Sequence, residues 1–179
     1  MKKLFTLTLS VLLFGCTTVP PKSMNANPPK WDHIGQISYE SKFPGLGIAN
    51  KYKSPEGVID VYVYDLQRGM WKDGVDDSAF ADHFLSTIDE VKYFAQKGTY
   101  GELQIGSITD ISIAGQKFRS VSFRFLREGQ QMESFTFLTA INGKLLKYRM
   151  SFFVPASFDL QLESRKFVEA DIHHYQKST

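Results

Sequence analysis

The sequence predicts an α+β domain in which a largely antiparallel sheet is combined with two helices, in the order βββ-α-ββββ-α. Three observations predict this class. Asn142-Gly143 stands between two apolar runs, and this dipeptide favours the type I′ turn of a β-hairpin because both residues adopt positive φ readily. Segments rich in Val, Ile and Tyr are separated by turns containing Pro and Gly, which is typical of strands. Two further stretches place apolar residues three or four positions apart, the spacing of a helix face.

Three strands are expected in the first half of the chain. They cover residues 34–39, 47–52 and 58–66, and turn-forming residues lie between them. In the third strand Tyr62 and Tyr64 share one side with Asp60. The two tyrosines are therefore expected either to face a binding partner or to pack beneath a helix.

The first helix is expected to follow these strands. Asp77 or Ser78 is a candidate N-cap, and Gly98 lies where a helix would stop. Its apolar stripe has spacings of four, four and three residues and consists of Phe80, Phe84, Ile88 and Val91. A strand over residues 103–113, bent near Gly106, is expected next.

A meander of three strands is predicted after that bend. A two-residue loop at Asn142-Gly143 opposes Phe137 to Tyr148 on an apolar face and Thr136 to Arg149 on the other face. Lys147 faces the same way as Arg149 because side chains alternate along a strand.

A second loop, at residues 127–131, is predicted to connect the first two strands of the meander. It opposes Phe123 to Phe135 and turns Ser122 and Arg124 outward. The two turns would together give one apolar inner face, which a shift of one residue would destroy.

The second helix is predicted to start at Ser157 and to continue past His174. Its apolar residues lie approximately on one side and are Phe158, Leu162, Val168, Ile172 and Tyr175.

The N-terminus has the parts of a secretory signal. Lys2 and Lys3 precede an apolar run over residues 4–14, and the run ends just before Cys16, which is the only cysteine in the chain. The run is too short to cross a hydrocarbon core of ~30 Å as a helix. Cleavage would remove both lysines and leave 19 basic and 19 acidic residues, a balance that gives no support for nucleic-acid binding.

Leu13-Phe14-Gly15-Cys16 resembles the bacterial lipobox. The resemblance implies that Cys16 becomes the lipidated N-terminus and anchors the protein to a membrane of the bacterial cell envelope. By the sorting rule of that family, Thr17 implies the periplasmic face of the outer membrane. The alternatives are an ordinary signal peptide followed by a lone cysteine, or an uncleaved N-terminus.

Three regions are thus expected in the chain. Residues 1–15 are a lipoprotein signal peptide, and residues 16–30 are the lipidated N-terminus and a proline-rich tether, extended at about 3.1 Å per residue. Residues 31–179 are long enough for one globular domain and too short for two comfortable ones.

A family resemblance lies in the turns and strands of the second half. The segments 111–117, 142–146, Gly129-Gln130 and Val154-Pro155-Ala156 resemble the C-terminal half of DcrB-type bacterial lipoproteins. Those proteins belong to a broader group with the fold of the photosystem extrinsic protein PsbP. The resemblance implies a PsbP-like α+β sandwich and a binding or assembly role, and it implies no catalytic residue.

No catalytic, metal or cofactor site is predicted. His173 and His174 point about 100° apart on a helix, so they cannot share one ion from the same face. The acidic residues around Asp76 lack the pattern of an EF-hand loop, and no Gly-x-Ser-x-Gly motif is present. His83 is expected on a helix surface.

One polar face of the meander is a candidate anion-binding site. It is expected to gather Arg124, Lys147 and Arg149 with the hydroxyls of Ser122 and Thr136, a set that suits a phosphorylated headgroup or a sugar acid. The simpler reading is a solvated sheet face.

The expected function is a lipid-anchored, non-enzymatic binding or accessory module of the cell envelope. Its partner would be another envelope protein or a ligand, bound by the polar face of the meander or by the strand with Tyr62 and Tyr64. The alternatives are a carrier of a small amphiphilic or anionic ligand, and a hydrolase with an unrecognised site.

Overall fold

The computed structural model describes residues 29–176, which contain eight strands and two helices. Strands β1 (Asp32–Ser38), β2 (Ile48–Ser54) and β3 (Gly57–Tyr64) precede helix α1 (Phe80–Gln96). Strands β4 (Gly101–Ile105), β5 (Thr109–Ile113), β6 (Gln116–Arg127), β7 (Gln130–Ile141) and β8 (Lys144–Phe153) follow, and helix α2 (Leu160–Gln176) comes last. The predicted α+β class and order are confirmed, with the strand expected to bend near Gly106 divided into β4 and β5.

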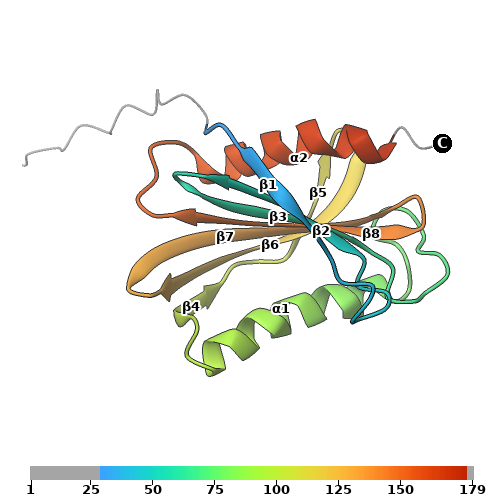
Figure 1. Ribbon diagram of the computed structural model, residues 1–179, viewed down its shortest axis with the longest axis horizontal. Helices are drawn as coiled ribbons and strands as arrows, with labels where there is room; N and C mark the ends of the chain where they lie inside the picture. Colours follow the sequence, from blue (N-terminus) through green and yellow to red (C-terminus); the bar gives the residue numbers. More distant parts are fainter. Residues whose placement is uncertain (1–28, 177–179) are drawn as a thin grey trace, which may run out of the picture.

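The strands form one antiparallel sheet. Its order is β1-β2-β3-β8-β7-β6-β4, and β5 also pairs with β6. Helices α1 and α2 cover opposite faces of this sheet, so the fold has three layers (Figure 1). Strands β3 and β8 lie side by side in the middle of the order, and this position places their residues beneath the helices.

Gly106 marks the division between β4 and β5. Its N–H donates to the Ser122 carbonyl at 2.8 Å, and a Cβ at this position would collide with the Ser122 hydroxyl. A larger residue here would require the Ser122 hydroxyl to rotate away, so glycine favours the close approach to β6 where the chain passes from β4 to β5.

The predicted pairing of β7 with β8 is confirmed. Phe137 lies opposite Tyr148, and Thr136 lies opposite Arg149. The connecting residues Asn142 and Gly143 have φ of 51° and 76°, as a type I′ turn requires.

The predicted pairing of β6 with β7 is wrong by one residue. Phe123 lies opposite Ser134, and Ser122 lies opposite Phe135. The connection is a two-residue turn at Glu128-Gly129, with φ of 52° and 78°, in place of the longer loop expected at 127–131. Because the side-chain period of a strand is two, this shift turns every side chain of β6 to the opposite face.

Two apolar clusters cover the two faces. On the α1 side, the helix stripe packs on Val121, Phe123, Phe125, Met132, Leu138, Ala140 and Leu145. On the α2 side, Val168 and Ile172 pack on Ile59, Val61, Phe118, Phe135, Phe137, Leu146, Tyr148, Met150 and Phe152. Each face of the central strands is therefore buried, and β7 is buried along most of its length.

The predicted α1 stripe is confirmed, since all four of its residues are buried. Gly98 has φ of 77° just past the helix end, in agreement with its expected role as a stop. The expected side-chain cap is absent: the Asp77 carboxylate accepts the N–H of Ala79 and of Lys72, and it pairs with Arg68 at 2.7 Å. Asp77 thus stabilises the turn that leads into the helix.

Helix α2 begins three residues later than expected. Asp159 accepts the Leu162 N–H at 2.9 Å, so the helix starts at Leu160. Leu162 is 51% exposed, which corrects its predicted place on the buried side, and Ser164 is buried instead. Ser164, Val168 and Ile172 are spaced by four residues, a regular helical stripe that Leu162 does not fit.

Candidate functional site

A hollow of about 390 Å³ lies between helix α1 and strands β3 and β8. Its volume is within the range of sites that take small ligands, ~300 to 1,000 Å³. Strand side chains form its floor and helix side chains form one wall, while the β1–β2 and β3–α1 loops border it. The lining residues are Tyr39, Leu46, Tyr62, Tyr64, Leu66, His83, Ser86, Thr87, Glu90 and Lys147.

Lys147 of β8 places a cation in this pocket. Its side chain is 15% exposed, and its ammonium lies 4.6 Å from the centre of the Tyr62 ring and 5.8 Å from that of Tyr64. Within residues 29–176, Glu90 is the one carboxylate within 4 Å, at 3.9 Å from Nζ. Burial lowers the pKa of Lys147, and the Glu90 charge opposes part of that shift.

The tyrosines supply ring faces and hydroxyls. Tyr62 and Tyr64 project from β3 on the same side as Lys147, which lies opposite Tyr62 in the β3–β8 pair. Burial raises the pKa of both hydroxyls, so they remain protonated donors near neutral pH. The cation–π contacts hold the ammonium on the pocket floor.

His83 of α1 is fixed by Tyr64. Its Nε2 atom lies 2.7 Å from the Tyr64 hydroxyl, and its ring contacts those of Tyr64 and Trp71, with centroids 5.5 and 5.9 Å away. Burial, followed by the nearby charge of Lys147, lowers the pKa of His83 to about 4. The imidazole is therefore neutral near pH 7. This corrects the expectation of an ordinary helix-surface histidine.

Ser86 and His83 do not form a nucleophile and base. The Ser86 hydroxyl lies 3.4 Å from His83 Nδ1, but it donates to the His83 backbone carbonyl at 2.7 Å. The other ring nitrogen contacts Tyr64 rather than a carboxylate that would orient the ring for base catalysis. This pair therefore gives no support to the hydrolase alternative.

The structure divides the predicted polar face between two sides of the sheet. Thr136, Lys147 and Arg149 lie on the α1 side, as expected for one face of the β7–β8 pair. Ser122 and Arg124 lie on the α2 side, because the observed pairing of β6 with β7 differs by one residue from the predicted pairing. Arg124 pairs there with Glu133 at 3.1 Å.

On the α1 side, only Lys147 of the predicted residues lines the pocket. Arg149 points away from the hollow and donates to the Tyr100 hydroxyl at 2.8 Å. Thr136 is buried, with 4% of its surface exposed, and lies on β7 between Val121 of β6 and Arg149 of β8. The candidate site is therefore built around one cation rather than three.

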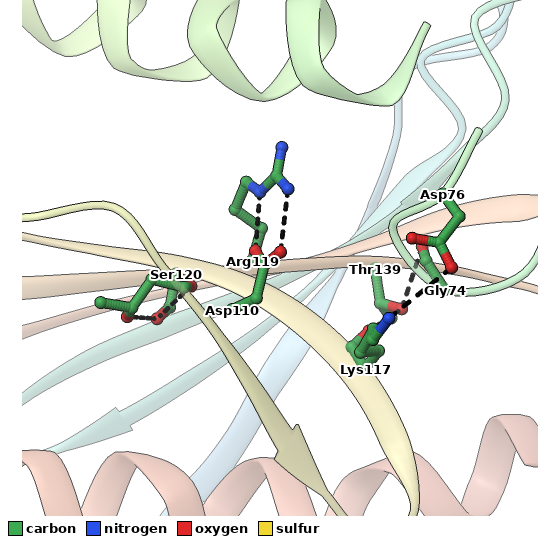
Figure 2. A network of polar contacts seen from close by, with 8 residues as sticks. Gly74, Asp76, Asp110, Lys117, Arg119, Ser120 and Thr139 are labelled. Carbon is green, nitrogen blue, oxygen red and sulfur yellow. Dashed lines mark hydrogen bonds and ion pairs between the residues drawn. The ribbon is translucent and has the colours of Figure 1, made fainter. Parts of the chain in front are cut away.

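A second polar cluster lies on β5, β6 and β7, next to the loop before α1. Arg119 makes two hydrogen bonds to Asp110, at 2.7 and 2.9 Å, and its guanidinium points toward α1 (Figure 2). The Thr139 hydroxyl donates to the Lys117 carbonyl at 2.7 Å, and Lys117 lies 3.7 Å from Asp76. The Arg119–Asp110 pair joins β6 to β5, and the loop is held on the sheet by reciprocal backbone bonds between Gly74 and Ala140, at 2.8 and 2.9 Å.

The other candidates give no further site. Among residues 29–176, no group of three or more His, Cys, Asp or Glu side chains is placed to hold a metal ion. No helix in that range is long and apolar enough to span a membrane. Cys16 lies outside the described residues, so its lipidation stays a prediction.

Comparison with known proteins finds similarity only among solved structures. No protein family matches the sequence, and no curated protein matches it. The chain is similar to the cyanobacterial PsbP (CyanoP) of Synechocystis sp. PCC 6803, with 12% identity, a TM-score of 0.47, and coverage of 81% of this chain and 79% of that chain. It is also similar to PA94 of Pseudomonas aeruginosa, a protein of unknown function, with 15% identity, a TM-score of 0.40, and coverage of 87% and 85%.

Proposed function

We propose that this protein is a non-enzymatic binding module of the bacterial cell envelope, anchored by lipid at Cys16, that holds a small anionic ligand between α1 and the sheet. The lipobox resemblance supports the anchor, and Thr17, by the sorting rule of that family, supports a location at the periplasmic face of the outer membrane. The ligand site follows from the pocket around Lys147.

The largely covered side chain of Lys147, which is 15% exposed, is the observation that carries the ligand proposal. A cation removed from water is costly unless a charge or hydrogen bonds compensate it. Glu90 compensates it weakly, since this carboxylate is 3.9 Å away and 49% exposed, and exposed ion pairs contribute ~0 to 1 kcal/mol. The Tyr62 and Tyr64 rings contribute cation–π contacts, and an anion in the pocket would add a close ionic partner, which no carboxylate of residues 29–176 supplies closer than 3.9 Å.

The rest of the pocket suits an anion attached to an apolar body. The Tyr62 hydroxyl can donate a hydrogen bond, whereas that of Tyr64 contacts His83, and the tyrosine rings and two leucines offer apolar surface. His83 is neutral near pH 7 and so adds neither attraction nor repulsion of full charge. Lys147 is the one charged donor of the lining in the described part of the chain.

Isothermal titration calorimetry tests the ligand proposal. The full chain carrying Cys16→Ser, which blocks acylation, is titrated with acetate, benzoate and octanoate. At least one acid is expected to bind, and Lys147→Met is expected to weaken it about tenfold or more, since a charge-assisted hydrogen bond contributes ~1.5 to 3 kcal/mol.

Lys117→Met is the matched control. Lys117 is 58% exposed and pairs with Asp76 away from the pocket, so its loss is expected to leave binding unchanged. Absence of binding for all three acids contradicts the proposal, and so does equal binding by the parent and Lys147→Met.

A separate experiment tests the anchor. Mass spectrometry of the protein from native membranes is expected to show Cys16 as an acylated N-terminus, and Cys16→Ser is expected to release the protein into the soluble fraction. An unmodified Cys16 in membrane-bound protein contradicts the anchor. Sedimentation of the parent with inner membranes contradicts the proposed outer-membrane location.

A further inference from the structure

The mouth of the pocket carries apolar side chains that the fold leaves in water. Leu46, on the loop between β1 and β2, and Leu66, on the loop between β3 and α1, line the pocket and are 40% and 38% exposed. Phe43 and Met70 lie on the same two loops and are 56% and 76% exposed. Of these four residues, Leu46 and Leu66 line the pocket and leave apolar surface exposed at its mouth.

The two loops are fixed to each other before any ligand binds. The Gly45 carbonyl accepts the N–H of Asp65 at 3.2 Å and of Leu66 at 2.8 Å, and Gln67 donates to the Pro44 carbonyl at 3.1 Å. Gly45 has φ of 86°, and a Cβ there would lie 2.8 Å from the backbone carbon of Leu66. The leucines therefore border a preformed opening.

The Glu40 carboxylate fixes the first loop from within. It accepts the N–H of Gly45 at 3.0 Å and of Gly47 at 2.7 Å. These bonds use an acidic side chain to organise the backbone, and the two N–H dipoles stabilise the Glu40 charge. An incoming acid meets leucine side chains first and Lys147 at the bottom.

We propose that the ligand is a single-chain amphiphile with one acidic head group, whose head contacts Lys147 and whose hydrocarbon chain leaves the pocket between Leu46 and Leu66. This inference rests on the proposed function, which places an anion at Lys147. The inference adds the chemical class of that ligand and its orientation in the pocket, with the head at Lys147 and the chain toward the mouth.

The charges of the pocket select one negative charge on the head. Lys147 is the one full positive charge among the described lining residues, and Glu90 stands 3.9 Å from its ammonium. A dianionic head such as a phosphate monoester would face Glu90 without a second cation, because Arg149 is directed to Tyr100. A carboxylate matches the site better.

The apolar mouth selects the body of the ligand. The pocket of about 390 Å³ is at the small end of small-ligand sites, so it has room for a head and the start of one chain. The remaining methylenes would cover the exposed leucines, and removing each methylene from water raises affinity by up to about fourfold.

The test is a chain-length series measured by calorimetry on the full chain carrying Cys16→Ser, with butanoate, octanoate and dodecanoate below their micelle-forming concentrations. Affinity is expected to rise about tenfold or more from butanoate to dodecanoate. The double variant Leu46→Ser/Leu66→Ser is expected to lose most of this increase while it binds butanoate as the parent does. Leu162→Ser is the matched control, because Leu162 is 51% exposed on α2 at the opposite face of the sheet.

The outcomes separate this inference from the proposed function. Equal affinity for all three acids, with binding still lost in Lys147→Met, overturns the amphiphile and retains the anion site. Binding that Lys147→Met leaves unchanged, or no binding at all, overturns both. A chain-length increase that persists in the leucine double variant shows that the chain lies elsewhere.

A second measurement covers the case in which the leucine double variant fails to fold. A fatty acid with a nitroxide on its chain is added to the parent, and methyl resonances are recorded by NMR. The Leu46 and Leu66 methyls are expected to broaden, while those of Leu162 stay sharp. Broadening confined to Leu162, or absent at Leu46 and Leu66, overturns the inference.

Discussion

Acidification is expected to lower the free energy of unfolding through His83. The loss is expected to begin near pH 6.5, although His83 of the folded protein takes up its proton only near pH 4. The pKa of His83 is about 4 in the folded state and 6.5 as its ordinary value. Between these values the unfolded chain binds a proton that the folded chain does not, so the free energy of unfolding falls as pH falls. The contribution is fully present above about pH 6.5 and is lost by about pH 4.

The size of the effect follows from the same two values. Each unit of difference between the two pKa values changes the free energy of unfolding by ~1.36 kcal/mol, so the total loss on acidification has an upper limit of ~3 kcal/mol. His83 is only partly buried, and solvent screening reduces this limit to about 1 to 2 kcal/mol.

Urea denaturation at pH 7 and pH 4.5 measures this loss, with His83→Gln as the reference. Glutamine can still hydrogen-bond to the Tyr64 hydroxyl but does not titrate. The parent is expected to lose about 1 to 2 kcal/mol more than His83→Gln over this interval. Equal losses refute the reasoning, as does an NMR titration in which the His83 ring has a midpoint at or above 6.5.

Three further outcomes are expected from the fold. Phe84→Ala removes a side chain that is 1% exposed beneath α1, so denaturant unfolding should show a loss of about 3 to 5 kcal/mol; a loss under 1 kcal/mol contradicts the packing of α1. Gly143→Ala places a Cβ at φ of 76°, and calorimetric melting should show a lower Tm by an amount corresponding to about 1 to 2 kcal/mol; an unchanged Tm contradicts the turn. In the Cys16→Ser background, oxidation should cross-link Arg124→Cys with Glu133→Cys, because these positions lie opposite each other. Arg124→Cys should not cross-link with Ser134→Cys, which faces the other side of the sheet. The reverse result contradicts the β6–β7 register.

The elements of the fold could be predicted because their signals are local. Phe84 and its neighbours repeat at helical spacing, and Asn142-Gly143 is a dipeptide that favours one turn type. The register of β6 could not be predicted in the same way. Glu128-Gly129 forms an equally tight turn. Glutamate rarely adopts positive φ, however, so the sequence indicates a longer loop at this point.

The candidate site was predictable only in part, for a related reason. Lys147 was expected to share a face with Arg149 because alternation along a strand fixes which residues lie together. The contribution of His83 and Glu90 depends on where α1 crosses the sheet, which is set by packing between residues far apart in the sequence. Packing beneath a helix is one of the two alternatives that the sequence leaves for Tyr64, but the sequence does not indicate that His83 meets its hydroxyl at 2.7 Å.

The most direct test of an anion site at Lys147 is an NMR titration of its side chain in the presence and absence of octanoate. The resonance is assigned by its loss in Lys147→Met, and the full chain carrying Cys16→Ser is used. In the free protein the midpoint is expected below the ordinary lysine value of 10.5, and saturating octanoate is expected to raise it, because a bound carboxylate favours the charged ammonium. A midpoint that is the same with and without octanoate contradicts an anion site at Lys147.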